Sequence, residues 1–168
     1  MAEVARQTLA DAGVNPERMS LEWASAAEGP RFVELITSYV NRIKGLGALG
    51  EGENEPGADV IARRLAAAVK AAGARKPRTA FGTLAKKLHK SGDYTPETVS
   101  AAVKEKVMPG LRLERICEEV KMCLADGARS AAELCDMTGA DDAEMEKALT
   151  ALSKKNAVRE DGGNWALA

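Results

Sequence analysis

Aromatic side chains, histidine and cysteine are all scarce in this chain of 168 residues, which has six aromatic residues, one histidine and three cysteines. The one histidine, His89, lies in a lysine-rich segment, and no Ser-His-acid arrangement can be assembled around it. Cys117, Cys123 and Cys135 form no C-x-x-C pair and no disulfide framework, which fits a reducing compartment. We therefore expect a cytoplasmic protein that is not a free-standing enzyme.

Long hydrophobic runs are also missing. No apolar stretch approaches the roughly 20 residues that a membrane span needs. The opening sequence MAEVARQTLADAG contains acidic residues and lacks the apolar centre of a secretory signal. Strong helix formers, above all alanine, are abundant instead, so a mainly α-helical protein is expected.

Charge is balanced over the whole chain, at a net value of −1, but not within its parts. Residues 1–57 carry 5 Lys/Arg against 9 Asp/Glu, residues 58–110 carry 11 against 4, and residues 111–168 carry 8 against 12. The middle third is therefore near +7, between two acidic thirds of −4 each. This pattern predicts different partners for the three parts, or docking of one part on another.

The opening of the chain predicts helix, strand and helix, which is half of an α/β layer. Residues 2–12 have one apolar face, and residues 31–44 form a second amphipathic helix. Between them, residues 18–24 alternate apolar and polar side chains, as in a strand with Met19, Leu21 and Trp23 on one face. A lone strand cannot pair its own backbone groups. We therefore expect it to pair across a homo-oligomer, or to lie against the helices in another way.

The middle of the chain predicts a flexible glycine-rich linker over residues 48–58 and a basic helical connector over residues 59–110. The connector's first helix has an apolar stripe and ends at Gly73. A basic helix follows over residues 77–91, and a third helix begins at Thr95-Pro96 and stops at Pro109-Gly110. The stripe of the first helix consists of Val60, Ile61, Leu65, Ala68, Val69 and Ala72.

Residues 111–168 predict three helices and a terminal β-hairpin, a pattern that resembles a winged helix-turn-helix domain. In a DNA-binding member the start of the third helix would contact bases. Here that start carries Asp141, Asp142, Glu144 and Glu146, which would meet phosphates. The composition therefore argues against nucleic acid and favours a protein-docking module, with Trp165 in its core.

A more specific pattern lies near the N-terminus. Residues 13–29 read GVNPERMSLEWASAAEG, and the helix after them closes in Lys44-Gly45-Leu46-Gly47. Over about residues 1–47 the chain resembles the C-terminal part of the delta-subunit family of methyl-viologen-reducing hydrogenase. The resemblance implies an iron–sulfur protein that passes electrons between a hydrogenase or dehydrogenase and a heterodisulfide-reductase-like flavoprotein.

The cluster-binding cysteines of that family precede the matching segment, whereas this chain has no cysteine before Cys117. We therefore expect no cofactor in this chain, although the resemblance implies an iron–sulfur cluster for the full-length family domain. Two explanations fit a start within the domain. The chain is a piece cut from a longer protein, or its reading frame begins after an upstream selenocysteine codon.

Ser25, Glu28 and Gly29 are the candidate cofactor-binding residues, because they stand between the expected strand and the next helix, where α/β proteins bind ligands and anions. The alternative is that Ser25 and Glu28 only cap the helix. A second candidate is the basic run from Arg75 to Lys90, which suits nucleic acid, solvent or the acidic thirds of the chain. The cysteines are more typical of buried apolar residues than of metal ligands.

Together these patterns predict a truncated α/β tail, a helical connector and a winged-helix-like module. The leading interpretation is an accessory or electron-transfer subunit of a hydrogenase–heterodisulfide-reductase type complex. The alternative is a winged-helix transcriptional regulator or adaptor without a redox function.

Overall fold

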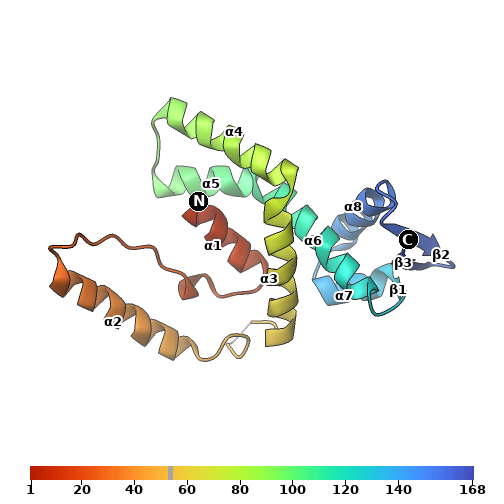
Figure 1. The fold of residues 1–168 in the computed structure, drawn as a ribbon, viewed down its shortest axis with the longest axis horizontal. Coiled ribbons are helices and arrows are strands. Elements are labelled where there is room, and N and C mark those ends of the chain that lie inside the picture. The colour runs from red at the N-terminus through yellow and green to blue at the C-terminus, as the bar shows by residue number, and fades with distance from the viewer. Residues whose placement is uncertain (53–54) are drawn as a thin grey trace.

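The computed structural model describes residues 1–52 and 55–168, and this part of the chain is mainly helical, as expected (Figure 1). Its elements are α1 (Ala2–Asp11), a 3₁₀ turn η1 (Pro16–Arg18), α2 (Gly29–Leu46), α3 (Ala58–Gly73), α4 (Arg75–Ser91), α5 (Pro96–Lys106), α6 (Met108–Leu124), β1 (Arg129–Ser130), α7 (Ala131–Thr138), α8 (Asp142–Ser153), β2 (Val158–Asp161) and β3 (Asn164–Leu167).

Helix boundaries follow local capping chemistry. The side chain of Thr95 accepts a hydrogen bond from the backbone N–H of Thr98 and starts α5, with Pro96 in the first turn. Ser130 and Asp141 each form a reciprocal capping box, with Glu133 and Glu144 respectively. Pro109 was expected to stop α5, but it lies in the first turn of α6, where its missing N–H costs nothing.

Helix α6 is the centre of the molecule (Figure 1). It packs along α3 and also contacts α1, α4 and α5, while its C-terminal half contacts α7, α8 and β3. One apolar core lies between α6, α7, α8 and the sheet, and Trp165 packs against it. A smaller core, around Leu84, Val103 and Val107, joins α4, α5 and the start of α6. Because α6 begins at Met108 and contributes to both halves, the predicted connector and C-terminal module share a helix.

The C-terminal sheet is antiparallel, with the strand order β1-β3-β2. The expected hairpin is present as β2 and β3, with Val158 opposite Leu167. The two-residue strand β1 was not expected; it pairs Arg129 with Trp165 and ties the start of α7 to the hairpin.

The predicted strand over residues 18–24 is wrong. Arg18 ends the turn η1, and residues 19–25 are extended but pair with no strand in the described part of the chain. The period-two alternation persists, because Ser20, Glu22 and Ala24 line a hollow against α2. Leu21 and Trp23 face away and are 59% and 78% exposed. Polar side chains thus cover the helix while apolar ones meet solvent.

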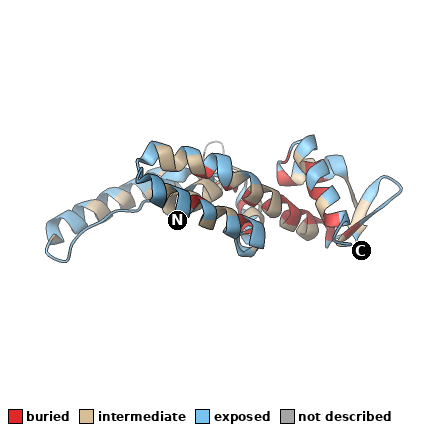
Figure 2. Ribbon diagram, turned by 90° about the horizontal axis from the view of Figure 1, so that it is seen from above, coloured by how far each residue is buried: buried red, intermediate tan, exposed pale blue. Residues whose placement is uncertain are grey.

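Residues 19–46, the extended segment together with α2, are called the arm. The arm stands off the remaining helices and forms the tapered end of the elongated molecule (Figure 2). No residue of α2 is buried, although the helix is amphipathic. The other described elements, α1 with η1 and α3 to β3, are called the body.

Candidate functional site

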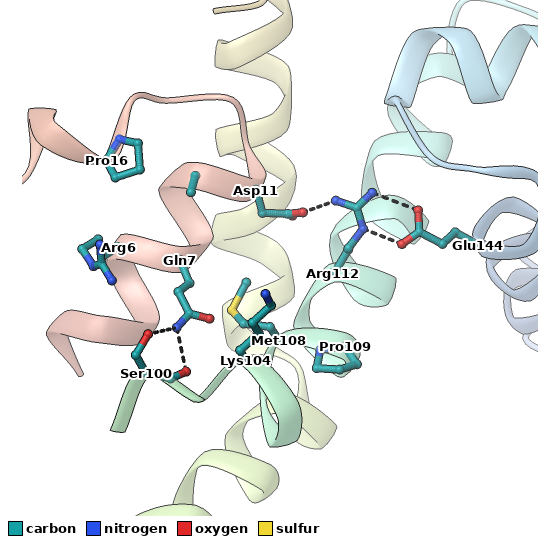
Figure 3. A pocket seen from close by; sticks show the side chains of 11 residues that line it. Arg6, Gln7, Asp11, Pro16, Ser100, Lys104, Met108, Pro109, Arg112 and Glu144 are labelled. Atoms are coloured by element: carbon teal, nitrogen blue, oxygen red, sulfur yellow. Dashed lines mark hydrogen bonds and ion pairs between the residues drawn. The ribbon is translucent and has the colours of Figure 1, made fainter. Parts of the chain in front are cut away.

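A network of ion pairs joins the N-terminal helix to the rest of the body. The carboxylate of Asp11, at the end of α1, accepts from Arg112 and from Arg115 on α6; its Oδ2 lies 2.6 Å from Arg115 Nε. Arg112 also donates to both oxygens of Glu144 on α8, at 2.5 and 2.9 Å. Arg112 is thus clamped between two carboxylates from helices at opposite ends of the chain (Figure 3).

The network continues inward to Glu119, whose side chain is fully buried. Glu119 accepts from Arg115 Nη1 at 2.5 Å and from Arg63 Nε at 3.0 Å, and Arg64 Nε lies 3.8 Å away. Burial raises the pKa of the Glu119 carboxyl, and the neighbouring guanidinium groups of Arg115, Arg63 and Arg64 oppose that effect. Arg63 also donates to the carbonyl of Met137 at 2.6 Å, so the network reaches the end of α7.

A hollow of about 580 Å³ lies beside this network, where α1, α5, α6 and α8 meet (Figure 3). Gln7 donates to the carbonyl of Ser100 at 3.0 Å and fixes α1 to α5 on one wall. The cations of the hollow are largely neutralised, because Arg6 pairs with Glu3 and Arg112 with two carboxylates. These contacts fasten α1 to the body and leave little charge for a ligand.

A second polar centre fastens the arm. Arg18 donates to the carbonyls of Leu46, Gly47 and Ala48, each at 3.0 Å, where α2 ends. The same guanidinium pairs with Glu55 at 3.0 Å, and the Arg18 and Glu55 side chains are 11% and 5% exposed. Arg18 lowers the pKa of the Glu55 carboxyl to about 2. A cation among the unpaired carbonyls of a helix C-terminus is favourable, so this pair latches α2 to the body.

The latch explains several residues of the Gly-Val-Asn-Pro-Glu-Arg motif. Asn15 caps the turn η1 by accepting from the backbone N–H of Glu17, and this turn presents Arg18. Glu55 also accepts from the backbone N–H groups of Asn15 and Gly50, so the described part of the predicted linker is anchored at this residue. At Gly13, φ is +91°, and a Cβ atom would lie 2.5 Å from Pro56. Only glycine fits there without rearrangement.

The arm itself carries an apolar surface. On α2, Phe32, Val33, Ile36 and Val40 are 41% to 62% exposed, in addition to the exposed Leu21 and Trp23. A hollow of about 420 Å³, lined in part by Phe32, Ile36 and Tyr39, runs between α2 and the extended segment. The hydroxyl of Tyr39 donates to the carbonyl of Arg18 at 2.6 Å and holds the two pieces together.

Ser25, Glu28 and Gly29 lie together at the exposed start of α2, as the sequence predicts. The Glu28 carboxylate accepts from the backbone N–H of Ser25 at 2.7 Å and from Arg31 at 3.2 Å. These hydrogen bonds lower the pKa of Glu28, with the backbone bond to Ser25 contributing most. The carboxylate therefore occupies a position that a bound anion would take, which favours the capping interpretation.

The cysteines do not fit an iron–sulfur cluster. Cys117 and Cys123 are buried in the C-terminal core, and burial raises the pKa of both thiols, that of Cys117 to about 11. Cys135 is partly exposed and lies 3.8 Å from Asp142, where burial and nearby carboxylates raise its pKa as well. Ligands must be thiolates. Within residues 1–52 and 55–168, no three His, Cys, Asp or Glu side chains are grouped to hold a metal ion.

Sequence reasoning missed the two polar centres. Arg18 belongs to the motif that carries the family resemblance, and this position was the only signal for the latch. The pairing of Asp11 with Arg112 and Arg115 joins residues 101 and 104 positions apart, and no local pattern encodes it.

Comparison with known proteins matches residues 1–47 to the family described as methyl-viologen-reducing hydrogenase, delta subunit. One relative, from Methanosarcina mazei, is the largest-lettered component of its enzyme by name only in part shared here: it is a component of ferredoxin:CoB-CoM heterodisulfide reductase and is 35% identical over 48 residues. The aligned segment is 29% of this chain and 6% of that relative. No solved structure matches the chain.

The matching segment comprises α1, η1 and the arm, so the likeness is confined to the N-terminal part of the protein. It links this part to proteins of hydrogenase and heterodisulfide reductase systems. No helix in the described ranges is both long enough and apolar enough to cross a membrane.

Proposed function

We propose that this chain is an accessory subunit of a hydrogenase–heterodisulfide-reductase type redox complex and that its arm docks on a partner subunit. The observation that carries the proposal is a coincidence of two independent findings. The segment that matches the delta-subunit family is the same segment that stands off the body with an uncovered apolar surface.

The geometry of the arm supports a docking role. Large exposed apolar patches on a soluble protein mark interaction sites. Here Leu21 and Trp23 lie on the extended segment, and Phe32, Ile36 and Val40 lie on α2. In the 94% of the relative that the alignment leaves out (100 − 6), other protein surrounds the corresponding segment. In this chain a partner subunit would take that place.

The body supplies the anchor, and redox chemistry would belong to the partner. The family is associated with iron–sulfur electron transfer, whereas the cysteines of this chain do not fit a cluster. The chain therefore positions and does not carry electrons. A homo-oligomer that covers the arm is the competing form of the same surface.

The test is binding of the full chain to a purified heterodisulfide-reductase-like flavoprotein subunit from the same organism, measured by calorimetry. The double variant Leu21→Asp/Ile36→Asp should lower the affinity roughly hundredfold. Burying each half-exposed side chain contributes about 1 to 1.5 kcal/mol, and tenfold in affinity is about 1.4 kcal/mol. Val69→Asp is the matched control, because Val69 is 76% exposed but lies on α3.

Native mass spectrometry of the free chain separates the outcomes. Binding that survives the arm variant would refute docking through this surface. A dimer that the arm variant dissociates, with no binding to the flavoprotein, would replace the partner subunit by a second copy.

A second candidate, a winged-helix regulator or adaptor, is favoured by the order α6-β1-α7-α8-β2-β3 and the small three-stranded sheet. The start of α8 carries Asp142, Glu144 and Glu146 next to its cap Asp141. These carboxylates disfavour phosphate contacts, so we propose that this module docks on protein. Submicromolar, salt-sensitive binding of random duplex DNA in a gel-shift titration would favour the regulator.

A further inference from the structure

Helix α4 carries positive charge without compensation. Its 17 residues, RKPRTAFGTLAKKLHKS, include six Lys/Arg and no Asp or Glu. All six cationic side chains are exposed: Arg75, Lys76, Arg78, Lys86, Lys87 and Lys90. None makes an ion pair with any residue that the structure describes. Glu105 on α5 is close enough for Lys87 to contribute to its lowered pKa, but its ion pair is with Lys106.

The arginines of α1, α3 and α6 behave differently. Arg6, Arg63, Arg64, Arg112 and Arg115 each have a carboxylate partner. The body therefore satisfies its cations wherever a structural role requires it, and leaves those of α4 open. On its inner side α4 is apolar, with Pro77 and Leu84 buried, so the basic side is the part available to a partner.

The positive surface continues onto α8. A hollow of about 670 Å³ lies where the start of α4 meets the C-terminal part of α8. Four lysines line it, with Glu146 as the one acidic residue in its lining: Lys76, Lys147, Lys154 and Lys155. The α4 cations and these lysines together are called the basic band. Its α4 part alone is about 25 Å long, at 1.5 Å per residue.

We propose that the basic band is a docking surface for the acidic face of a second, compact protein. The band is long and exposed, it is flanked by acidic regions, and it offers side chains suited to carboxylates. It is separate from the arm, and the proposal does not depend on the function proposed above.

Nucleic acid fits the band less well. No aromatic side chain projects from α4 for base stacking, because Phe81 packs against the core of α4 and α5. The residues 111–168 have a net charge of −4 (8 − 12), so a long polyanion leaving the band toward α8 would meet repulsion. A compact partner avoids this cost, because its contact ends with the band.

The electrostatics predict fast, salt-sensitive association. Complementary charge steers diffusional encounter and raises association rates more than it lengthens the lifetime of a complex. The Debye length is about 8 Å at about 0.15 M salt, so attraction between exposed charges is weakened there.

The test uses the full chain with poly-L-glutamate as the acidic probe and a random duplex of about 20 base pairs as the competitor. Binding is followed by amide chemical shifts at about 20 mM and about 150 mM salt. The variant Lys86→Glu/Lys90→Glu is compared with Lys44→Glu/Arg159→Glu, whose two cations are exposed and lie outside the band. Both variants take the net charge from −1 to −5, because each of two substitutions subtracts 2.

We expect poly-L-glutamate to shift residues 75–90 at low salt and to bind at least about tenfold more weakly to the α4 variant, with a change below about twofold in the control. Circular dichroism checks that both variants stay helical. Absence of binding at low salt, or equal loss in both variants, would overturn the proposal. Duplex that displaces poly-L-glutamate from residues 75–90 at about 150 mM salt would show that the band serves nucleic acid instead.

Discussion

Replacing Asp11 by alanine removes the carboxylate that fastens α1 to α6 and leaves the buried guanidinium of Arg115 with fewer partners. Arg115 is 2% exposed and Asp11 is 10% exposed. After the substitution Arg115 keeps only its ion pair with Glu119, while Arg112 keeps only Glu144. Breaking a buried ion pair from one side is costly because the remaining charge cannot be rehydrated.

The expected loss is about 3 to 5 kcal/mol for Asp11→Ala. Asp11→Asn should cost less, about 2 kcal/mol, because the amide oxygen still accepts one hydrogen bond. Glu3→Ala is the control on the same helix: its ion pair with Arg6 is largely exposed, at 48% for the Arg6 side chain, and should contribute below about 1 kcal/mol.

Urea unfolding followed by far-ultraviolet circular dichroism measures these losses. A double-mutant cycle between Asp11→Ala and Arg112→Ala should return a coupling energy of about 0.5 to 3 kcal/mol, because the two side chains share one ion pair. If Asp11→Ala costs no more than Glu3→Ala, the network does not stabilise the body and the reasoning fails.

Two other outcomes follow from the pKa shifts. Because Arg18 lowers the pKa of Glu55 from 4.5 to about 2, the stability that the latch contributes is present above about pH 4.5 and is lost as the pH falls toward 2. Amide exchange at the end of α2 should therefore rise across this window, and Glu55→Gln should abolish the pH dependence; unchanged pH dependence in the variant would contradict the assignment. Thiol labelling at neutral pH should modify Cys135 first, because burial protects Cys117 and Cys123; rapid modification of Cys117 in the folded protein would show that its surroundings open.

Helices were predictable because their signals are local. Capping residues such as Thr95 and Ser130, together with apolar spacing, placed most helices within a few residues. The strand over residues 18–24 failed because alternation describes side-chain direction, whereas a strand also needs a neighbour for its backbone. Val69 failed for a related reason: α3 presents small side chains such as Ala67, Ala68 and Ala71 to its neighbours, and Val69 points to solvent.

The polar centres required the structure. Asp11 ends a short amphipathic helix, and nothing in its sequence neighbourhood distinguishes it from other exposed acids. Glu55 lies in a glycine-rich stretch typical of linkers, yet it is 5% exposed and pairs with Arg18. Such pairs depend on tertiary placement, and composition shows only the charges that take part.

The long sequence separation between Asp11 and its partners also sets an order of events during synthesis. At about 5 to 20 residues per second, Arg112 leaves the ribosome roughly 5 to 20 s after Asp11, because the two are 101 positions apart. Throughout that interval α1 has no ion-pair partner on α6, while the arm, complete at residue 46, is already outside the body. A nascent chain therefore presents its family-matching segment before it has a folded body, and a partner subunit has that interval in which to bind it first.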